Sequence, residues 1–229
     1  MRVAEGEVHV WAAHLDELTP ETSRFLRLLA PEEKERAARF YRQTDCDHFL
    51  CARGVLRSLL AGYAGIAPED LAFRCNAYGK PYLAEEGALQ FNVSHSHGLA
   101  LYAIASGREI GIDVEWIRQT PDLMKIAGRF FSPREVRELE AAPPESQLRA
   151  FFRCWTRKEA YIKAKGLGLS IPLKDFSVSS ADGGPSAVVA SESGWHVWNA
   201  DPAPGYLGAL AVEASECKLV VRKFSPSGL

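Results

Sequence analysis

The stretch Gly111-Ile112-Asp113-Val114-Glu115 places two acids two residues apart in an otherwise apolar segment. In a β-strand, residues i and i+2 lie on one face, so both carboxylates leave the backbone together, about 6.6 Å apart along it. An exposed strand face would explain the pattern equally well. The apolar neighbours, with Ile110 before them, favour instead a strand that is buried or lines a cleft, where two charges require a partner. The stretch therefore predicts a cation site.

A long helix predicted at 146–165 offers a third carboxylate. Its segment Trp155-Thr156-Arg157-Lys158-Glu159-Ala160 precedes Lys163, so Glu159 and Lys163 lie one turn apart on one face. The two side chains could form only a helix ion pair, worth about 0.3 to 0.5 kcal/mol. Aromatic residues spread around this helix, however, and favour packing inside the protein. We therefore predict that Asp113, Glu115 and Glu159 form one Mg²⁺ site, since Mg²⁺ prefers oxygen ligands.

The composition is that of a globular chain of 229 residues, with 24% charged residues and a net charge of −2. Nucleic-acid binding needs a basic footprint, so this class of function is excluded. No apolar run is long enough for a membrane span and the N-terminus lacks a signal-peptide pattern, so we expect a cytoplasmic protein. The five cysteines contain no C-x-x-C pair, which favours free thiols over zinc ligands or disulfides.

Two halves of the chain share the same order of segments. Residues 29–33 and 131–135 both place proline before acidic residues, at an offset of 102 residues, and 98–106 resembles 206–215. This repetition indicates an internal duplication. We expect an α+β fold, a pseudo-dimer of two similar α+β halves with the active site in the cleft between them. The halves are placed at residues 1–108 and 109–229.

Local signals predict individual elements. Ser132-Pro133-Arg134-Glu135 has the form of a capping box, with proline at the first helical position. Short segments of alternating apolar residues predict strands at 91–96, 99–106 and 109–117. The short turn at 106–108 suggests that the last two strands form a hairpin. Residues 176–224 are strand-like, with a turn expected at 182–185.

Groups suited to a phosphate ligand occur in three further places. The segment Phe91-Asn92-Val93-Ser94-His95-Ser96 offers hydroxyls and an imidazole, and His95 is flanked by two serines. Gly79-Lys80-Pro81 is a turn in which backbone amides can also face an anion. Arg36 and Arg53 lie on predicted helices, where basic faces are usually only solvated, but Arg53 belongs to an otherwise apolar helix.

Together these motifs resemble the Sfp-type 4′-phosphopantetheinyl transferases over nearly the whole chain. The resemblance rests on five motifs in order: Gly79-Lys80-Pro81, Phe91 to Ser96, Gly111 to Glu115, Arg129-Phe130-Phe131-Ser132, and Trp155 to Ala160 with Lys163 and Gly166-Leu167-Gly168-Leu169. The family fold is a pseudo-dimer with the cofactor site between its halves. The resemblance implies that coenzyme A donates its phosphopantetheine arm to a serine of an apo acyl or peptidyl carrier protein, releasing adenosine 3′,5′-bisphosphate.

The resemblance also implies roles for individual residues. Asp113, Glu115 and Glu159 would hold Mg²⁺ on the pyrophosphate, and Glu159 could deprotonate the carrier serine directly or through water. Lys158 and Lys163 would balance the phosphate charge during catalysis. Other contacts to coenzyme A would come from Ser94 and His95 at the phosphates, Gly79, Lys80 and Pro81 at the adenosine, and Arg36 and Arg53 at the 3′-phosphate. The sequence departs from the family at Glu33, where relatives often have a further basic residue.

The helix after the acidic strand is the candidate surface for the carrier. Carrier domains tend to be acidic around their serine, so apolar and basic residues are the expected complement. They are Arg118, Leu123, Met124, Lys125 and Arg129. Leu123 and Met124 could equally belong to the core.

Two other functions fit the same residues. A Mg²⁺-dependent phosphohydrolase acting on CoA-like pyrophosphates would use the carboxylates and lysines to serve water. An inactive module would bind CoA or a carrier without turnover. Relatives of this two-half size more often serve secondary-metabolite carriers, so the resemblance implies this class of carrier. The built-in pseudo-dimer predicts a monomer.

Overall fold

The computed structural model describes residues 1–85, 87, 89–179, 186–188, 194–214 and 216–226. Its helices are α1 (Leu15–Leu18), α2 (Thr22–Leu28), α3 (Pro31–Ala37), α4 (Gln43–Ala64), α5 (Leu123–Phe130), α6 (Pro133–Ala141) and α7 (Pro144–Lys165). Its strands are β1 (Glu7–His14), β2 (Phe73–Cys75), β3 (Pro81–Leu83), β4 (Leu89–Ser96), β5 (Leu99–Ser106), β6 (Ile110–Trp116), β7 (Ser186–Ala187), β8 (Trp195–Asn199), β9 (Tyr206–Glu213) and β10 (Lys218–Lys223). This mixture of helices and sheets confirms the α+β class.

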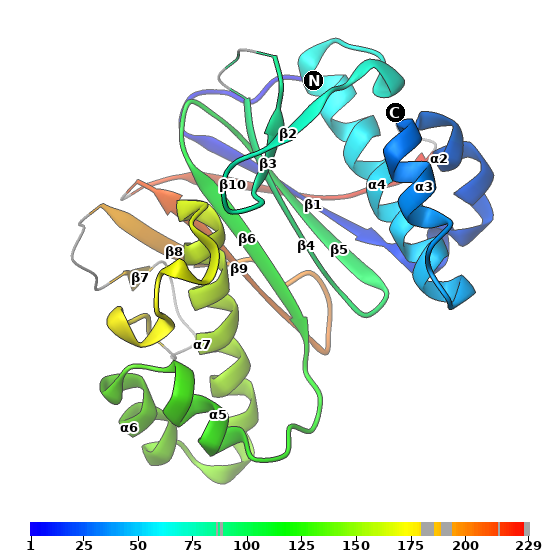
Figure 1. Ribbon diagram of the computed structural model, residues 1–229. Coiled ribbons are helices and arrows are strands. Elements are labelled where there is room, and N and C mark those ends of the chain that lie inside the picture. The colour runs from blue at the N-terminus through cyan, green and yellow to red at the C-terminus, as the bar shows by residue number, and fades with distance from the viewer. Residues whose placement is uncertain (86, 88, 180–185, 189–193, 215, 227–229) are drawn as a thin grey trace.

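The first sheet has the strand order β10-β1-β5-β4 and carries α4 on one face (Figure 1). β1 and β4 pair antiparallel with β5, and β10 pairs parallel with β1. Leu56 and Leu59 of α4 are buried against Phe91 and Tyr102 of the sheet. β10 lies near the C-terminus, whereas the other three strands of the first sheet lie before residue 107.

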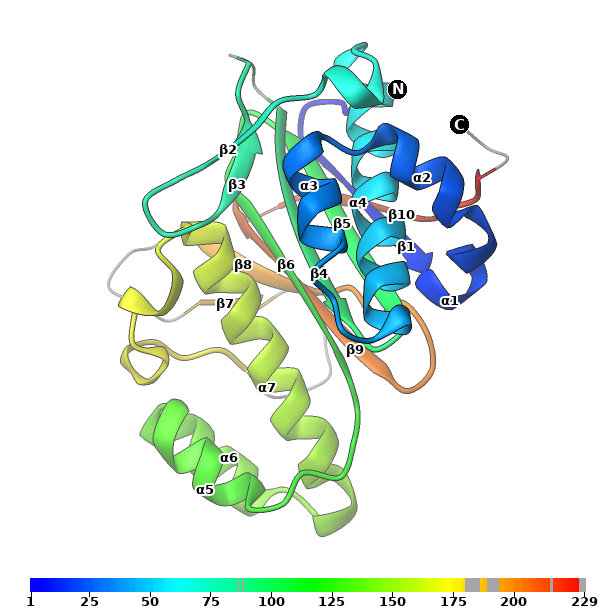
Figure 2. The ribbon, with the colours of Figure 1, turned by 45° about the vertical axis from the view of Figure 1, so that its right-hand side comes forward.

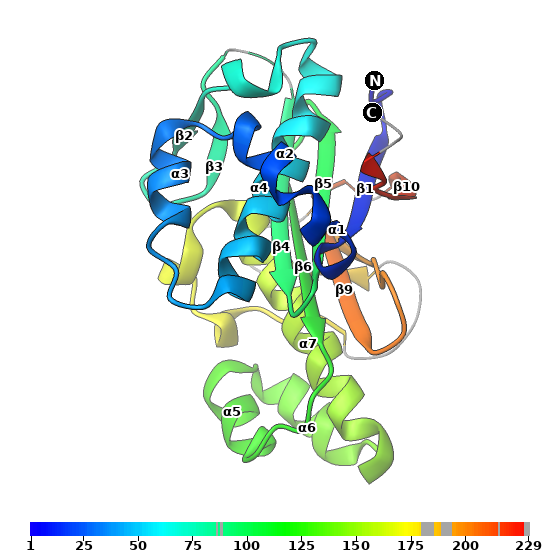
Figure 3. The ribbon, with the colours of Figure 1, turned by 90° about the vertical axis from the view of Figure 1, so that its right-hand side faces the viewer.

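The second sheet has the order β6-β9-β8-β7, with antiparallel pairing throughout, and carries α7. Tyr161 and Ile162 of α7 share a buried cluster with Val197 of β8 and Ala209 of β9. Helices α5 and α6 pack at one end of α7, away from α2 and α3 at the other end of the molecule (Figure 3). Each sheet therefore has its own covering helix.

The remaining faces of the two sheets pack against each other. Leu99 and Leu101 of β5 share a buried cluster with Ile112 of β6 and Leu210 of β9. Figure 1 accordingly shows α4 and α7 on opposite sides of the paired sheets. Because side chains alternate along a strand, Asp113 leaves β6 on the face that α7 covers. The layering thus decides which helix the acids of β6 meet.

The predicted hairpin between 99–106 and 109–117 is wrong. β5 pairs on one edge with β1 and on the other with β4, so neither edge is free for β6. The turn at 106–108 instead carries the chain into the second sheet, where β6 pairs with β9. β4 and β6 still lie side by side as the neighbouring edges of the two sheets (Figure 2).

Other local predictions have mixed outcomes. The capping box is confirmed, because the Ser132 amide donates to Glu135 Oε2 (2.7 Å) and the Glu135 amide donates to Ser132 Oγ (3.3 Å). The turn expected at 182–185 lies outside the described residues. All five cysteines are free thiols. None of the described helices combines the length and the apolar character that a membrane span needs.

Candidate active site

The acids of β6 face α7 across an unusually close contact at Gly111. A Cβ atom built on this glycine would lie 2.2 Å from the Ala160 carbonyl oxygen and 2.2 Å from the Ala164 amide nitrogen. Glycine is therefore required for the helix to approach the strand at this point. The same approach brings the next turn of α7 over Asp113, which is only 4% exposed.

Lys163 makes the direct link between α7 and the acids. Its Nζ lies 2.6 Å from Asp113 Oδ1 and 2.9 Å from Ser94 Oγ. The Ser94 hydroxyl donates to the same carboxylate oxygen at 2.8 Å. Three groups from β4, β6 and α7 therefore converge on one point, the junction between the two sheets.

Burial and neighbouring charge raise the pKa values of two of the three acids. Desolvation raises the pKa of Asp113, although Lys163 and Ser94 oppose the shift. The pKa of Glu159 is raised by burial and then by the Asp113 and Glu115 charges, against the effect of Lys163. The mutual effect shows that the three carboxylates lie within electrostatic range of one another. Such repulsion between like charges disfavours ionisation of Asp113 and Glu159.

One oxygen of the acids has the environment that a bound cation would satisfy. Asp113 Oδ2 is buried and has no hydrogen-bond partner among the described residues, a rare situation for a carboxylate oxygen. A hard cation would satisfy this oxygen and offset the repulsion with Glu115 and Glu159. No group of three His, Cys, Asp or Glu side chains in the described residues is gathered as a formed metal site. The chemistry of the acids fits a cation, while in this structure Asp113 is paired with Lys163 and Glu115 with Arg118.

The prediction that Lys158 belongs to this site is contradicted. Its side chain is 0% exposed and its Nζ lies 2.8 Å from Glu135 Oε2, 2.6 Å from the Leu173 carbonyl and 2.7 Å from the Phe176 carbonyl. All three ammonium protons are therefore used inside the second half. The physical reason is helical geometry, because consecutive residues point about 100° apart and Glu159 takes the direction of the acids.

A cavity of about 780 Å³ lies between α3, α4 and β4. Arg36 and Arg53 both line it. Arg36 stacks over Phe49, with 5.2 Å from its Cζ to the ring centre, and Arg53 stacks over Phe73 at 4.9 Å. Leu15, Asp16, Phe40, Thr44, Asp45, His48, Ala52, Leu56, Pro81, Val93, His95, His97 and Gly98 complete the lining.

Glu33 holds Arg53 in the wall of this cavity. Arg53 Nε donates to Glu33 Oε1 at 2.6 Å, and a second Arg53 nitrogen contacts the same oxygen. Arg57 Nε donates to Glu33 Oε2 at 2.7 Å. Burial alone would raise the pKa of Glu33, but Arg53, the Ala30 amide and Arg57 outweigh it and lower the pKa. The departure from the family noted at Glu33 thus has a structural role, the fixing of two arginines.

The remaining predicted contacts fall into two groups. His95 lines the cavity, where desolvation and the Lys163 charge lower its pKa, although the residue is exposed to solvent. Ser94 is buried, and its hydroxyl is directed at Asp113 rather than at the cavity. Lys80 Nζ bonds to Glu109 Oε2 (2.6 Å) and to the Ala164 carbonyl (2.9 Å), so Lys80 clamps its turn to the second half. Gly79 has a φ of +87°, which suits this turn.

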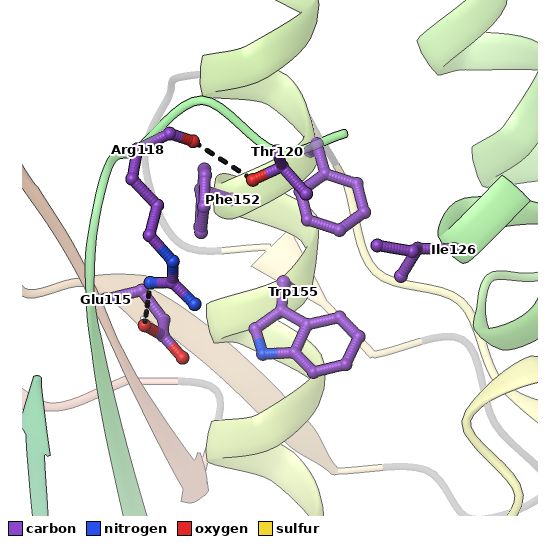
Figure 4. Close-up of a pocket in the computed structure, with 7 residues that line it drawn as sticks. Glu115, Arg118, Thr120, Ile126, Phe152 and Trp155 are labelled. Atoms are coloured by element: carbon purple, nitrogen blue, oxygen red, sulfur yellow. Dashed lines mark hydrogen bonds and ion pairs between the residues drawn. The ribbon is translucent and has the colours of Figure 1, made fainter. Parts of the chain in front are cut away.

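A smaller pocket of about 140 Å³ lies beside Glu115 (Figure 4). Figure 4 shows Trp155, Phe152 and Ile126 around it, with Arg118 reaching toward Glu115. The Arg118 and Glu115 side chains lie 3.4 Å apart. Leu123 and Met124 are half-buried against the core of the second half, while Lys125 and Arg129 are exposed. Glu115 therefore lines a small aromatic pocket, while the large cavity reaches β4 at Val93 and His95.

Sequence reasoning overlooked several residues of this region. Asn92 and Ser96 bond to β6, and Phe151 and Phe152 line the small pocket beside Trp155. The alternation of polar residues along 92–96 is a signal that could have singled out the first two. Nothing in the sequence pattern distinguishes the two phenylalanines from core residues.

Comparisons with known proteins identify the family of the chain. The family model "4′-phosphopantetheinyl transferase superfamily" matches residues 109–211, and "4′-phosphopantetheinyl transferase, N-terminal" matches residues 11–107. The 4′-phosphopantetheinyl transferase HetI of Nostoc sp. is 39% identical over 215 residues, covering 93% of this chain and 90% of that protein. The 4′-phosphopantetheinyl transferase Sfp of Bacillus subtilis is 34% identical over 188 residues, covering 81% and 83%. The chain therefore belongs to the 4′-phosphopantetheinyl transferase superfamily.

Proposed function

We propose that the protein transfers the 4′-phosphopantetheine arm of coenzyme A to a serine of an apo acyl or peptidyl carrier protein and releases adenosine 3′,5′-bisphosphate. The observation that carries this proposal is the place of Asp113, buried beside Lys163 with one oxygen unpartnered. Glu115 lines the small pocket, and Val93 and His95, the neighbours of Ser94, line the large cavity, so two substrates can approach the acids from different sides.

We further propose that the two halves, 1–108 and 109–229, form a pseudo-dimer with the active site between them. Several correspondences support it. α4 and α7 each contain 22 residues and end at a glycine with positive φ, Gly65 and Gly166. Glu33 and Glu135 each accept from the backbone three residues earlier and pair with a cation on the long helix of the same half. β10 belongs to residues 109–229 but pairs with β1 of the first sheet, so this strand departs from the two-half arrangement.

Asp113, Glu115 and Glu159 would hold the Mg²⁺, with Asp113 Oδ2 as the oxygen that most needs it. When bound, the cation would neutralise pyrophosphate charge, which is the main requirement of phosphoryl transfer. Lys163 of α7 lies next to Asp113 and would also help to neutralise the pyrophosphate charge. Lys158 is withdrawn from this role because its ammonium is fully used elsewhere.

Glu159 would take the proton from the carrier serine, directly or through water. Its raised pKa suits a general base, because a carboxylate with an ordinary pKa binds the proton too weakly at neutral pH. The serine oxygen would form a bond to the phosphorus that bears the pantetheine arm. The bond from that phosphorus to the bridging oxygen would break, and adenosine 3′,5′-bisphosphate would leave with the electron pair.

The nucleotide end of coenzyme A would occupy the large cavity. Arg36 and Arg53 would bind the 3′-phosphate, since guanidinium groups suit phosphate oxygens through paired hydrogen bonds. His95 would contact the phosphates, and Gly79 and Pro81 would flank the adenosine, with Lys80 fixing that turn. Ser94 would act on the phosphates mainly through Lys163 and Asp113.

The carrier would approach over α5 and the small pocket. Arg118, Lys125 and Arg129 supply positive charge there, and Leu123 and Met124 supply partly exposed apolar surface. An acidic carrier with an apolar contact beside its serine fits this combination. Secondary-metabolite carriers are the class we would test first.

The competing function is hydrolysis of CoA-like pyrophosphates. Incubation with CoA, Mg²⁺ and a panel of apo carriers separates the two by mass spectrometry. Transfer yields a carrier heavier by one phosphopantetheine, and omission of the carrier should leave CoA intact. Free phosphopantetheine formed without modified carrier would identify a hydrolase, and CoA binding without any product would identify an inactive module.

A further inference from the structure

β4 and β6 are joined by side chains instead of by a backbone ladder. Each is the last strand of its own sheet in the described residues, and they lie side by side (Figure 2). The amide of Ile112 donates to Asn92 Oδ1 at 2.9 Å, and the amide of Trp116 donates to Ser96 Oγ at 3.1 Å. Between them, the Val114 amide lies 3.3 Å from Ser94 Oγ. All three bonds join residues 20 positions apart, so the strands run parallel in register.

This side-chain ladder, Asn92, Ser94 and Ser96, follows from the alternation of β4. On the opposite face of β4, Phe91 is buried under α4 and Val93 packs partly buried against the same cluster, so the polar set faces the other sheet. The amides of β6 that point away from β9 would otherwise be unpaired at a buried edge, which is costly. The ladder therefore supplies the hydrogen bonds that a fifth strand would have made.

The two serines do more than complete the edge. Ser94 donates its hydroxyl proton to Asp113 Oδ1 at 2.8 Å, and Ser96 donates to Glu115 Oε2 at 2.9 Å. Each serine accepts from the amide of the residue that follows its acid, so it touches the β6 backbone and a carboxylate together. Such a two-point contact fixes both the strand position and the rotamer of the acid.

We propose that Ser96 is a positioning residue for Glu115, with Asn92 holding the strand register that Ser96 needs. The inference rests on the proposed function only in taking Glu115 as a site acid. Outer hydrogen-bond partners of metal-binding carboxylates orient them, and their loss typically reduces metal affinity or activity by about 10- to 100-fold. Ser96 contributes one neutral donor to a half-buried acid, so the low end of that range applies.

Binding of Mn²⁺ alone, followed by the spin-resonance signal of the free ion, tests the proposal without reference to turnover. We expect Ser96→Ala to weaken Mn²⁺ binding by about tenfold and to raise the Mg²⁺ needed for half-maximal transfer by a similar factor. KM for CoA at saturating Mg²⁺ should stay within about twofold, since Ser96 does not line the large cavity. Ser96→Thr keeps the hydroxyl and should restore both values.

Ser146→Ala is the matched control. The Ser146 hydroxyl donates to the Pro143 carbonyl at the start of α7, so this change also removes one serine hydrogen bond but far from the acids. Ser96→Cys keeps the side-chain volume and weakens the donor, and it replaces Ser96→Ala if that variant fails to fold. Wild-type Mn²⁺ binding in a folded Ser96→Ala or Ser96→Cys variant would overturn the positioning role. Absence of Mn²⁺ binding and of Mg²⁺-dependent transfer in the wild type would instead overturn the proposed metal site.

Discussion

Single residues at the junction of the sheets are held in a compromise between burial and charge. Asp113 loses solvation on folding and recovers part of it through Lys163 and Ser94. Glu159 lies near the like charges of Asp113 and Glu115, and the charge of Lys163 offsets part of their effect. Repulsion of this kind lowers the stability of the fold, so stability does not explain why the carboxylate is there. Binding of a cation, which would offset the repulsion, does explain it.

Glu159→Gln tests this compromise through pH. A carboxyl whose pKa is higher in the folded protein stabilises the fold at low pH, and that contribution is lost as pH rises from the ordinary value of 4.5 through the raised one. Without metal, Glu159→Gln should therefore be more stable to urea than the wild type at pH 7. The difference should vanish near pH 4, where both side chains are neutral. A variant that is less stable at pH 7 would contradict the raised pKa.

Arg53→Ala tests the assignment of the large cavity. KM for CoA should rise by about tenfold, the effect of losing a hydrogen bond to a charged group. KM for dephospho-CoA should change little, because the 3′-phosphate is absent. Arg39→Ala, which removes an exposed arginine near Glu35, serves as the control. Equal effects of Arg53→Ala on the two substrates would place the 3′-phosphate elsewhere.

At the scale of elements, α7 presents different chemistry on its different sides. Glu159 and Lys163 turn toward β6, while Lys158 enters the core between α6 and the segment after α7. Ala160 and Ala164 keep the contact surface small enough for Gly111 to touch the helix backbone. The strand and the helix therefore act as one rigid unit that sets the distance between the acids.

Gly111→Ala should disturb that unit. The added methyl group would meet helix backbone, so we expect a loss of about 1 to 3 kcal/mol in the free energy of unfolding, as for other overpacked sites, together with reduced transfer. Gly128→Ala on α5 is the control, because its Cβ has open space and alanine favours a helix. Urea unfolding and carrier modification measure the two effects. Full activity and stability in Gly111→Ala would refute the close contact.

Lys158→Ala separates a structural lysine from a catalytic one. Glu135 is buried with Lys158, and removal of one partner from a buried ion pair typically costs about 3 to 5 kcal/mol. The variant should therefore unfold at much lower urea concentration than the wild type. Unchanged stability with abolished transfer would return Lys158 to the active site.

For the whole molecule, sequence patterns predicted the parts better than their assembly. The limits of 99–106 and the capping box at Ser132 were correct because they depend on local alternation and local hydrogen bonds. The predicted partner of β6 was wrong, because strand pairing depends on which edges remain free, and β1 and β4 occupy both edges of β5. The prediction that Lys158 points into the active site was wrong for a similar reason, since its partner Glu135 lies on another helix.

The packing of the two sheets explains the location of the candidate active site. Two sheets pack face to face, so their neighbouring edges, β4 and β6, bring groups from both halves to one line. α7 covers that line from one side, while the large cavity under α3 and α4 opens near His95. Neither half contains the acids, Lys163, Ser94 and the arginines together. The activity should therefore depend on the junction.

The most direct test compares the wild type with Asp113→Asn by the intact mass of an apo carrier after incubation with CoA and Mg²⁺. Asparagine keeps the shape of the side chain and an oxygen for Lys163 and Ser94, so the fold should persist by circular dichroism. We predict full conversion of the carrier by the wild type and at least about 100-fold slower conversion by Asp113→Asn, the scale expected when charge at a metal site is lost. Conversion by folded Asp113→Asn at the wild-type rate would contradict the account.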